Sequence, residues 1–174
     1  MLDDIYEESE YPLAYLLTFR TYGTWLHGDE RGSIARHGKV RPSAVRIEPN
    51  VPLQDSMLKS AKQPAVKLDL AQRNIVTEAI REVCEYRGYT MYALNVRSNH
   101  THAVIGTAMK PEKIVNDLKA YATRRLRERW QMGSHERVWA RGASTRYLWK
   151  PRHLAGAVDY VLYCQENVPF EFRD

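Results

Sequence analysis

The chain has few cysteines and no long apolar run, and each absence excludes a class of protein. Its 174 residues include two cysteines, Cys84 and Cys164, and they do not form a Cys-x-x-Cys pair. A zinc knuckle and a disulfide framework are therefore not indicated. No apolar stretch approaches the roughly 20 residues that a membrane span requires. The acidic first ten residues are unlike a secretory signal, so we expect a cytoplasmic protein.

Several enzyme classes are disfavoured in the same way, because their motifs are missing. The sequence contains no Gly-x-Ser-x-Gly, no P-loop and no dinucleotide-binding fingerprint. The sequence does contain an excess of basic residues, with 26 Lys and Arg against 21 Asp and Glu. The arginines cluster, which favours a phosphate-bearing partner, although a merely soluble basic surface is the alternative.

Hydrophobic periodicity predicts one domain over residues 1–174, with residues 1–10 loose and a long irregular insertion at 23–64. Strands are predicted at 11–22, 89–96, 100–107 and 145–150. Helices are predicted at 70–87, 111–131 and 154–166. The order strand, helix, strand, strand, helix, strand indicates an α+β, ferredoxin-like fold. In that fold an antiparallel sheet carries both helices on one face, and the added C-terminal helix can pack across the other.

The motif His100-Thr101-His102 lies in the third predicted strand, which is central in this topology. Side chains at i and i+2 of a strand point to the same face, so the two imidazoles can bind one divalent ion. With six histidines in the chain, a chance pair with a structural role is the competing interpretation.

The C-terminal predicted helix supplies candidates for the rest of a site. Tyr160 and Tyr163 are possible nucleophiles, because a phenoxide can attack phosphorus to give a phosphotyrosine ester. A polar residue such as Gln165 or Glu166 can add a metal ligand. The alternative is that both tyrosines are core aromatics.

Basic residues of the second predicted helix and the last strand are the candidate DNA contacts. Phosphate contacts combined with stacking on aromatic side chains are the usual way to hold a single strand. A solvated helix face is the alternative. The candidates are Lys119, Arg124, Arg125, Arg127, Arg146 and Lys150.

The run Asn99-His-Thr-His-Ala-Val-Ile105 resembles the signature of the single-tyrosine HUH transposases. These are the insertion-sequence 200/605 type and their relatives associated with repetitive extragenic palindromes. The resemblance extends from residues 15–25 to residues 158–165. The chain departs from the family at Thr101, where an apolar residue is usual, but that side chain points away from the histidine face.

The resemblance implies a bacterial, metal-dependent nuclease and strand transferase that acts on hairpin-flanked single-stranded DNA, commonly as a homodimer. His100 and His102 would hold Mg²⁺ or Mn²⁺, and Gln165 would be a further ligand. Tyr160 would form a 5′-phosphotyrosine, with Tyr163 as the alternative nucleophile. Tyr160 and Gln165 are five residues apart, about 140° around a helix, so they share a face less well than an i, i+4 pair.

Two other functions compete with this one. A non-catalytic nucleic-acid-binding module of the same fold needs neither the histidine pair nor the helix tyrosine. A phosphoesterase acting on small nucleotides would need a second histidine signature and would have no use for the arginine-rich helix.

Overall fold

A computed structural model describes residues 10–24, 33–34, 46–47, 50–130, 133 and 135–163. Its main sheet contains, in spatial order, β4 (Thr90–Val96), β5 (His100–Gly106), β1 (Ala14–Arg20) and β6 (Ser144–Leu148). All neighbouring strands are antiparallel. This is the predicted ferredoxin-like order, with the first and third strands of the motif at the centre of the sheet.

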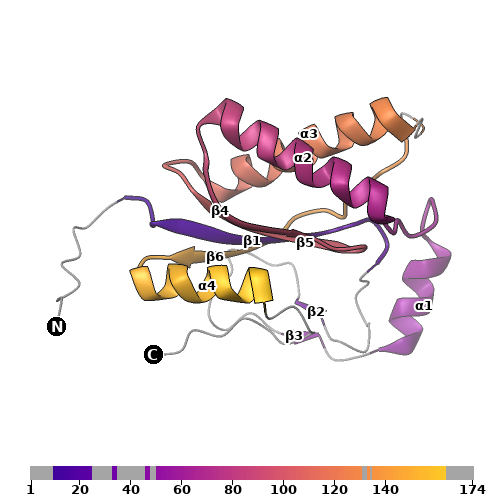
Figure 1. The fold of residues 1–174 in the computed structure, drawn as a ribbon. Helices are drawn as coiled ribbons and strands as arrows, with labels where there is room; N and C mark the ends of the chain where they lie inside the picture. The colour runs from indigo at the N-terminus through magenta and orange to yellow at the C-terminus, as the bar shows by residue number, and fades with distance from the viewer. Residues whose placement is uncertain are drawn as a thin grey trace.

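Helices cover both faces of the sheet (Figure 1). The helices α2 (Leu70–Arg87) and α3 (Pro111–Trp130) lie side by side on one face. The helix α4 (Pro151–Tyr163) crosses the opposite face and contacts β4, β5 and β6. The sheet is therefore the middle layer of a three-layer arrangement, and its two faces have different roles.

Local sequence explains the ends of α2. Asp69 accepts a hydrogen bond from the Gln72 backbone N–H at 2.8 Å, and the Gln72 side chain accepts one from the Asp69 N–H at 3.0 Å. This reciprocal capping box satisfies amides that a helix start leaves without partners. At the other end Gly88 has φ of 68°, a left-handed conformation that glycine adopts without a side-chain clash. Gly88 therefore ends the helix as the sequence predicts.

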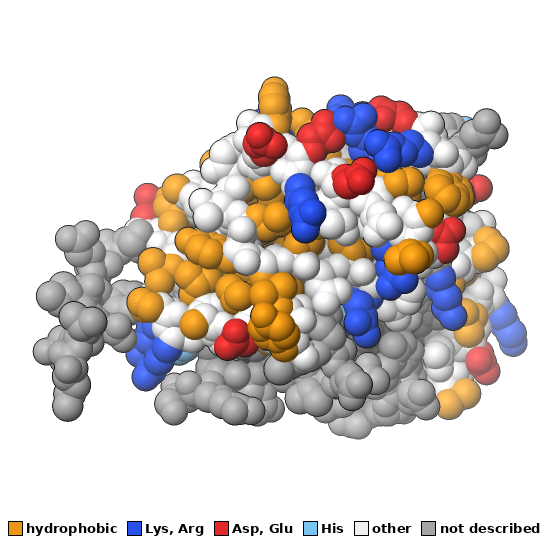
Figure 2. Space-filling view, viewed as in Figure 1, with side chains coloured by type: hydrophobic (Ala, Val, Ile, Leu, Met, Phe, Trp, Pro, Cys, Tyr) orange, Lys and Arg blue, Asp and Glu red, His pale blue; other side chains and the backbone are white. Residues whose placement is uncertain are grey.

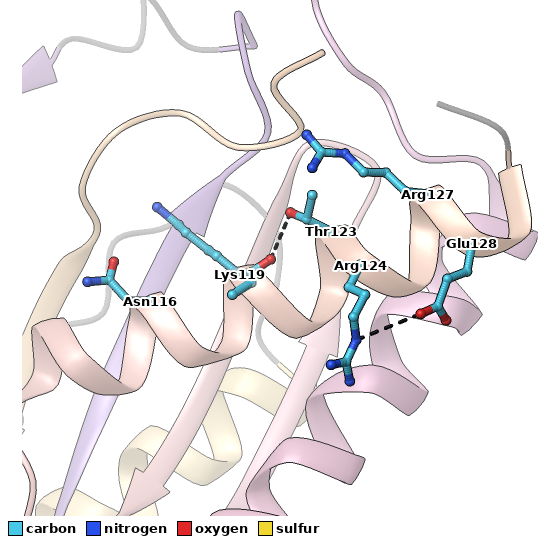
Figure 3. A pocket seen from close by; sticks show the side chains of 7 residues that line it. Asn116, Lys119, Thr123, Arg124, Arg127 and Glu128 are labelled. Atoms are coloured by element: carbon cyan, nitrogen blue, oxygen red, sulfur yellow. Dashed lines mark hydrogen bonds and ion pairs between the residues drawn. The ribbon is translucent and has the colours of Figure 1, made fainter. Parts of the chain in front are cut away.

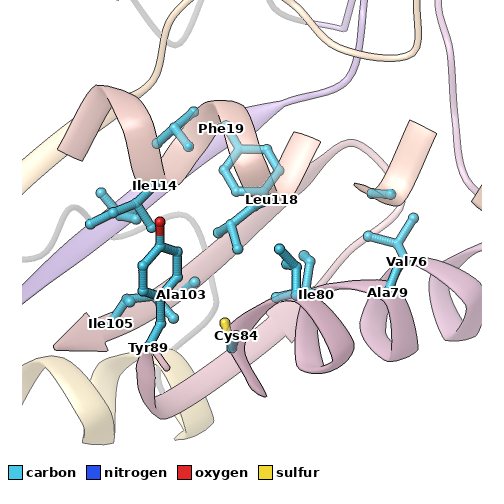
Figure 4. Close-up of a cluster of buried hydrophobic side chains, with 14 of the residues drawn as sticks. Phe19, Val76, Ala79, Ile80, Cys84, Tyr89, Ala103, Ile105, Ile114 and Leu118 are labelled. Atoms are coloured by element: carbon cyan, nitrogen blue, oxygen red, sulfur yellow. The ribbon is translucent and has the colours of Figure 1, made fainter. Parts of the chain in front are cut away.

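The main hydrophobic core lies between the sheet and the α2–α3 layer (Figure 4). Alternate residues of β1 and β5 face it, among them Phe19 and Ile105. The helices contribute their apolar stripes, which include Ile80 and Leu118. A second cluster on the other face joins Leu16 and Val104 of the strands to Ala157 and Val161 of α4, with other residues around them. Both faces of the central strands are therefore buried, which makes them a stiff platform.

The segment 23–64, predicted to be irregular, contains regular structure. Residues Val51–Lys59 form the helix α1, and β2 (Ser33–Ile34) pairs with β3 (Arg46–Ile47). Asn50 caps α1 by accepting a hydrogen bond from the Leu53 N–H at 3.0 Å. None of the α1 residues is buried, so no apolar stripe marks this helix in the sequence. Of residues 1–10, which are predicted to be loose, residues 1–9 lie outside the described residues.

Across the described residues, no helix combines the length and the apolar character that crossing a membrane requires.

Replacing Thr101 with valine is expected to raise the free energy of unfolding by about 1 kcal/mol. Thr101 is fully buried on the α2–α3 side of β5, and its hydroxyl has no hydrogen-bond partner among the described residues. Valine keeps the shape and removes an unsatisfied polar group. Urea unfolding measures the change. The matched control is Thr21→Val, because the buried Thr21 hydroxyl donates to the Asn99 carbonyl at 3.1 Å and its loss should destabilise the protein. A Thr101→Val variant that loses stability as Thr21→Val does would contradict this account.

Candidate active site

His100 and His102 lie on the α4 side of the sheet, because alternate residues of β5 face opposite ways. Their ring centroids are 4.7 Å apart, with the ring planes at 77°. Thr101, between them, points to the opposite face. The strand is buried and has hydrogen-bonded neighbours on both sides, so the two imidazoles are held on a rigid support.

Neighbouring polar groups orient both rings. The His100 Nδ1 and the Asn99 Oδ1 are 2.7 Å apart, and the Oδ1 can only accept, so Nδ1–H is the donor. In the neutral form of His100 the lone pair is therefore on Nε2. His102 Nδ1 shares a hydrogen bond of 2.7 Å with the Thr18 hydroxyl on β1. Fixing one ring nitrogen in this way is how proteins set the tautomer and the direction of a metal-binding histidine.

The pKa of His102 falls from 6.5 to about 3, chiefly because burial penalises the charged imidazolium. The positive charges of His100, Arg20 and Arg97 lower it further. His102 is therefore neutral at physiological pH. A neutral imidazole is the form that binds a metal ion.

This shift predicts how stability depends on pH. Between pH 6.5 and 3 the unfolded chain binds a proton at His102 that the folded protein does not bind. The free energy of unfolding should therefore fall as the pH falls through this range, by about 1.4 kcal/mol per pH unit from this group. Urea unfolding in EDTA at pH 6.5, 5.75 and 5, above most carboxylate titrations, measures the slope. The slope should be smaller in His102→Gln and unchanged in a variant of the exposed His135. Equal slopes in all three proteins would exclude the shift.

The helix α4 brings Tyr160 to the histidine pair. The Tyr160 ring centroid is 5.5 Å from that of His102, with the planes at 76°. Buried Ala157 and Val161 fix this side of α4 against the sheet. The Asn95 side-chain amide of β4 also donates to the Val161 carbonyl at 3.2 Å. The half-buried Tyr160 therefore occupies a defined place opposite the imidazoles.

The other residues predicted on this helix are placed differently or are not described. The side chain of Tyr163 is 78% exposed, and no ring contact to the histidine pair is found for it. The predicted ligand Gln165 lies outside the described residues. Tyr160, and not Tyr163, thus has a ring contact with the histidine pair. The role of Gln165 as a metal ligand stays a prediction.

Four side chains at this site were not selected from the sequence as functional residues. Thr18 and Asn99 orient the imidazoles, and Asn95 holds α4 in place. Arg20 pairs with His100 across β1 and β5, which places its side chain on the histidine face. Asn99 precedes the motif and was within reach of sequence reasoning. The others depend on strand register and helix docking, which no local pattern specifies.

The predicted DNA contacts on α3 lie on the face of the sheet opposite the histidines (Figure 1). Three of them line an open hollow of about 570 Å³ along this helix (Figure 3). Lys119 donates to the Ala140 and Gly142 carbonyls at 3.0 and 2.6 Å. Arg127 donates to the Glu136 carbonyl at 3.1 Å. These contacts attach the segment after α3 to the helix.

The other two predicted contacts on α3, Arg124 and Arg125, are in ion pairs. Arg125 contacts Glu82 of α2 at 2.6 Å and Glu128 at 3.0 Å. Arg124 lies 3.8 Å from Glu128 and packs over the Tyr121 ring. Figure 2 accordingly shows basic and acidic side chains intermingled over the helix layer. DNA binding by α3 remains a prediction, and the observed role of these cations is structural.

The remaining predicted contacts, Arg146 and Lys150, are in and just after β6. Arg146 is opposite Leu16 in the sheet, and Leu16 belongs to the cluster under α4. Arg146 is therefore on the same face as the histidines, two strands away from β5.

The donor set partly fits a divalent metal ion. The neutral imidazole of His102 and the ring of His100 lie on one face, and the Nδ1 of each is hydrogen-bonded. Among the described residues, no group of three or more His, Cys, Asp or Glu side chains that could hold a metal ion is found. A further ligand would have to come from outside the described residues, such as the predicted Gln165 or Glu166, or from a DNA phosphate or water.

A family model supports the resemblance. No curated protein matches the chain. A crystal structure of a candidate transposase from Deinococcus radiodurans R1 superposes with a TM-score of 0.45 and 14% identity, over 82% of this chain and 83% of that one. The family model of IS200-like transposases matches residues 59–164, which is more than half of the sequence and includes His100, His102 and Tyr160. The chain therefore belongs to the IS200-like transposase family.

Proposed function

We propose that this transposase cleaves and rejoins hairpin-flanked single-stranded DNA in a metal-dependent reaction, with Tyr160 as the nucleophile. The observation that carries the proposal is the position of the Tyr160 ring, 5.5 Å from His102 across the interface between α4 and β5. A binding module has no need for a tyrosine beside two oriented imidazoles. The family match supplies DNA transposition as the context.

The chemistry is a transesterification at phosphorus. The Tyr160 oxygen forms a bond to the phosphorus of the cleaved linkage, and the bond from phosphorus to the 3′ oxygen breaks. The products are a 5′-phosphotyrosine on the protein and a DNA strand with a free 3′-hydroxyl, which takes up the proton lost by the phenol. The phosphodiester energy is retained, so a 3′-hydroxyl can reverse the step and join a new strand.

The protein contributes position and charge. Burial of the α4–sheet interface holds Tyr160 in line with the imidazoles and limits the motion that attack would otherwise require. Arg20, on the same face as His100, adds positive charge where a phosphate would approach. His100 and His102 would hold Mg²⁺ or Mn²⁺ through Nε2, with Gln165 as the proposed further ligand. When bound, such an ion polarises the phosphate and stabilises the charge of the transition state.

The direct test is covalent trapping. The protein is incubated with end-labelled, hairpin-flanked single-stranded DNA and Mn²⁺ or Mg²⁺, then separated on a denaturing gel. We expect a protein–DNA adduct that forms with either ion and is absent in EDTA. Binding of the same DNA without an adduct, under every metal condition, would favour the non-catalytic module instead. The proposed homodimer is measured separately, by light scattering of the protein with and without DNA.

A further inference from the structure

Two exposed aromatic rings are stacked on the edge of the sheet, outside the candidate active site. Tyr147 in β6 and Trp149 just after it have ring centroids 6.3 Å apart and planes only 14° apart. They are 45% and 38% exposed. Tyr147 is fixed from beneath by the buried Tyr15 ring, which meets it edge-on with centroids 5.1 Å apart. A pair of rings held parallel and partly open to solvent is a small apolar surface that a flat ligand can cover.

In the stretch of sequence that contains these rings, every charged residue is basic. Between residues 137 and 158 the sequence contains no Asp or Glu. Its charged residues in this range are Arg137, Arg141, Arg146, Lys150 and Arg152. This basic run of sequence on either side of the stacked rings suits a polyanion that also has flat apolar faces.

We propose that Tyr147 and Trp149 form a stacking platform for unpaired bases of the single-stranded DNA substrate. A nucleobase can stack on these rings as they stack on each other, and the phosphates on either side meet the basic residues. This inference rests on the proposed function, because it assigns part of the path that the substrate strand follows.

The position of the platform suits a strand that continues past the active site. Ser144, at the start of β6, is level with His102, since both pair with Thr18 of β1. Tyr147 lies three residues further along, or about 10 Å. Arg146 is on the histidine face and Tyr147 on the opposite one, and β6 is the last strand on this side of the described sheet. A strand rounding this edge can place a phosphate at Arg146 and the adjacent base on Tyr147.

The test measures binding of a fluorescein-labelled single-stranded oligonucleotide by anisotropy, in EDTA so that no cleavage occurs. Tyr147→Leu and Trp149→Leu are each expected to weaken binding about tenfold, because base–aromatic stacking contributes that much. Trp149→Phe keeps a stacking ring and should bind within about twofold of the wild-type protein. A blunt duplex of the same sequence should be affected little by any of these changes, because its bases are already stacked.

The matched control is Tyr86→Leu, which removes an aromatic ring that is 72% exposed on α2. Its affinity should equal that of the wild-type protein. Unchanged affinity in Tyr147→Leu and Trp149→Leu, with circular dichroism showing folded proteins, would overturn the platform. Weaker binding in Tyr86→Leu alone would do the same and would place the DNA on the helix layer.

The result is separable from the test of catalysis. Normal adduct formation with normal affinity in the double variant would reject the platform and leave the proposed function intact. Weakened binding in a protein that never forms an adduct would retain the platform and reject strand transfer.

Discussion

Tyr160→Phe will lose the covalent protein–DNA adduct, by at least about 1000-fold in rate, and Tyr163→Phe will form it at the wild-type rate. The two residues are three positions apart on α4, but only Tyr160 makes a described contact with the histidine pair. Phenylalanine keeps the ring that packs beside His102 and removes only the oxygen that would bond to phosphorus. The adduct on a denaturing gel is the measurement.

The comparison is informative because each variant controls for the other. Both lose one phenolic oxygen from the same helix, and neither leaves a cavity. Anisotropy with the same oligonucleotide should show that both variants bind DNA equally well. The missing adduct in Tyr160→Phe then reports loss of the cleavage step and not of DNA binding. A full adduct yield from Tyr160→Phe, with none from Tyr163→Phe, would identify Tyr163 as the nucleophile. In that case α4 would have to move when DNA binds.

Much of the fold could be predicted from the sequence because local and long-range signals agree in this chain. The apolar residues of 70–87 and 111–130 recur at helical spacing, and both segments form helices that bury those residues. Gly88 marks the end of α2, and the short turn before His100 indicates a hairpin. These elements in this order leave few alternatives to the ferredoxin-like sheet. α1 was not predicted, because an exposed helix has no apolar stripe by which to recognise it.

The candidate site was predictable only in part. The i, i+2 spacing of His100 and His102 places both on one face of any strand, so the pair could be recognised from the sequence. Thr18 is 84 positions from His102, and only the register of β1 against β5 brings them together. The choice of Tyr160 over Tyr163 depends on how α4 is rotated on the sheet. Buried Ala157 and Val161 determine that rotation, and two tyrosines three residues apart carry no such information.

The arginines of α3 are a pattern that is easy to recognise in the sequence but has two interpretations. A cluster of basic residues in a helix predicts phosphate binding or a salt-bridged surface equally well. The acidic residues that decide between these are distant in sequence, since Glu82 in α2 contacts Arg125 across the helix pair. The stacked rings at β6 were overlooked for a related reason. Tyr147 and Trp149 are two apart in the sequence, but their exposure at a sheet edge is a property of the fold.

Removing either imidazole should lower the rate of metal-dependent adduct formation by about 100-fold or more, because each would supply one of few protein ligands to the ion. His100→Gln and His102→Gln are the variants, and the measurement is adduct formation at rising Mn²⁺ concentration. Both should need much more Mn²⁺ for half-maximal yield. Binding of DNA in EDTA should stay at the wild-type level, since neither change removes a lysine, an arginine or an aromatic of the platform.

Thr18→Val separates a metal-binding role for His102 from a purely structural one. It keeps the imidazole but removes the hydroxyl 2.7 Å from its Nδ1, so the ring loses the contact that orients it. A group that orients a ligand typically contributes about 10-fold to 100-fold in metal affinity or activity. The Mn²⁺ requirement of Thr18→Val should therefore rise, by less than in His102→Gln, and excess Mn²⁺ should restore much of its activity. If the histidines only fill space between α4 and the sheet, both His→Gln variants will instead lose stability and keep the wild-type dependence on Mn²⁺.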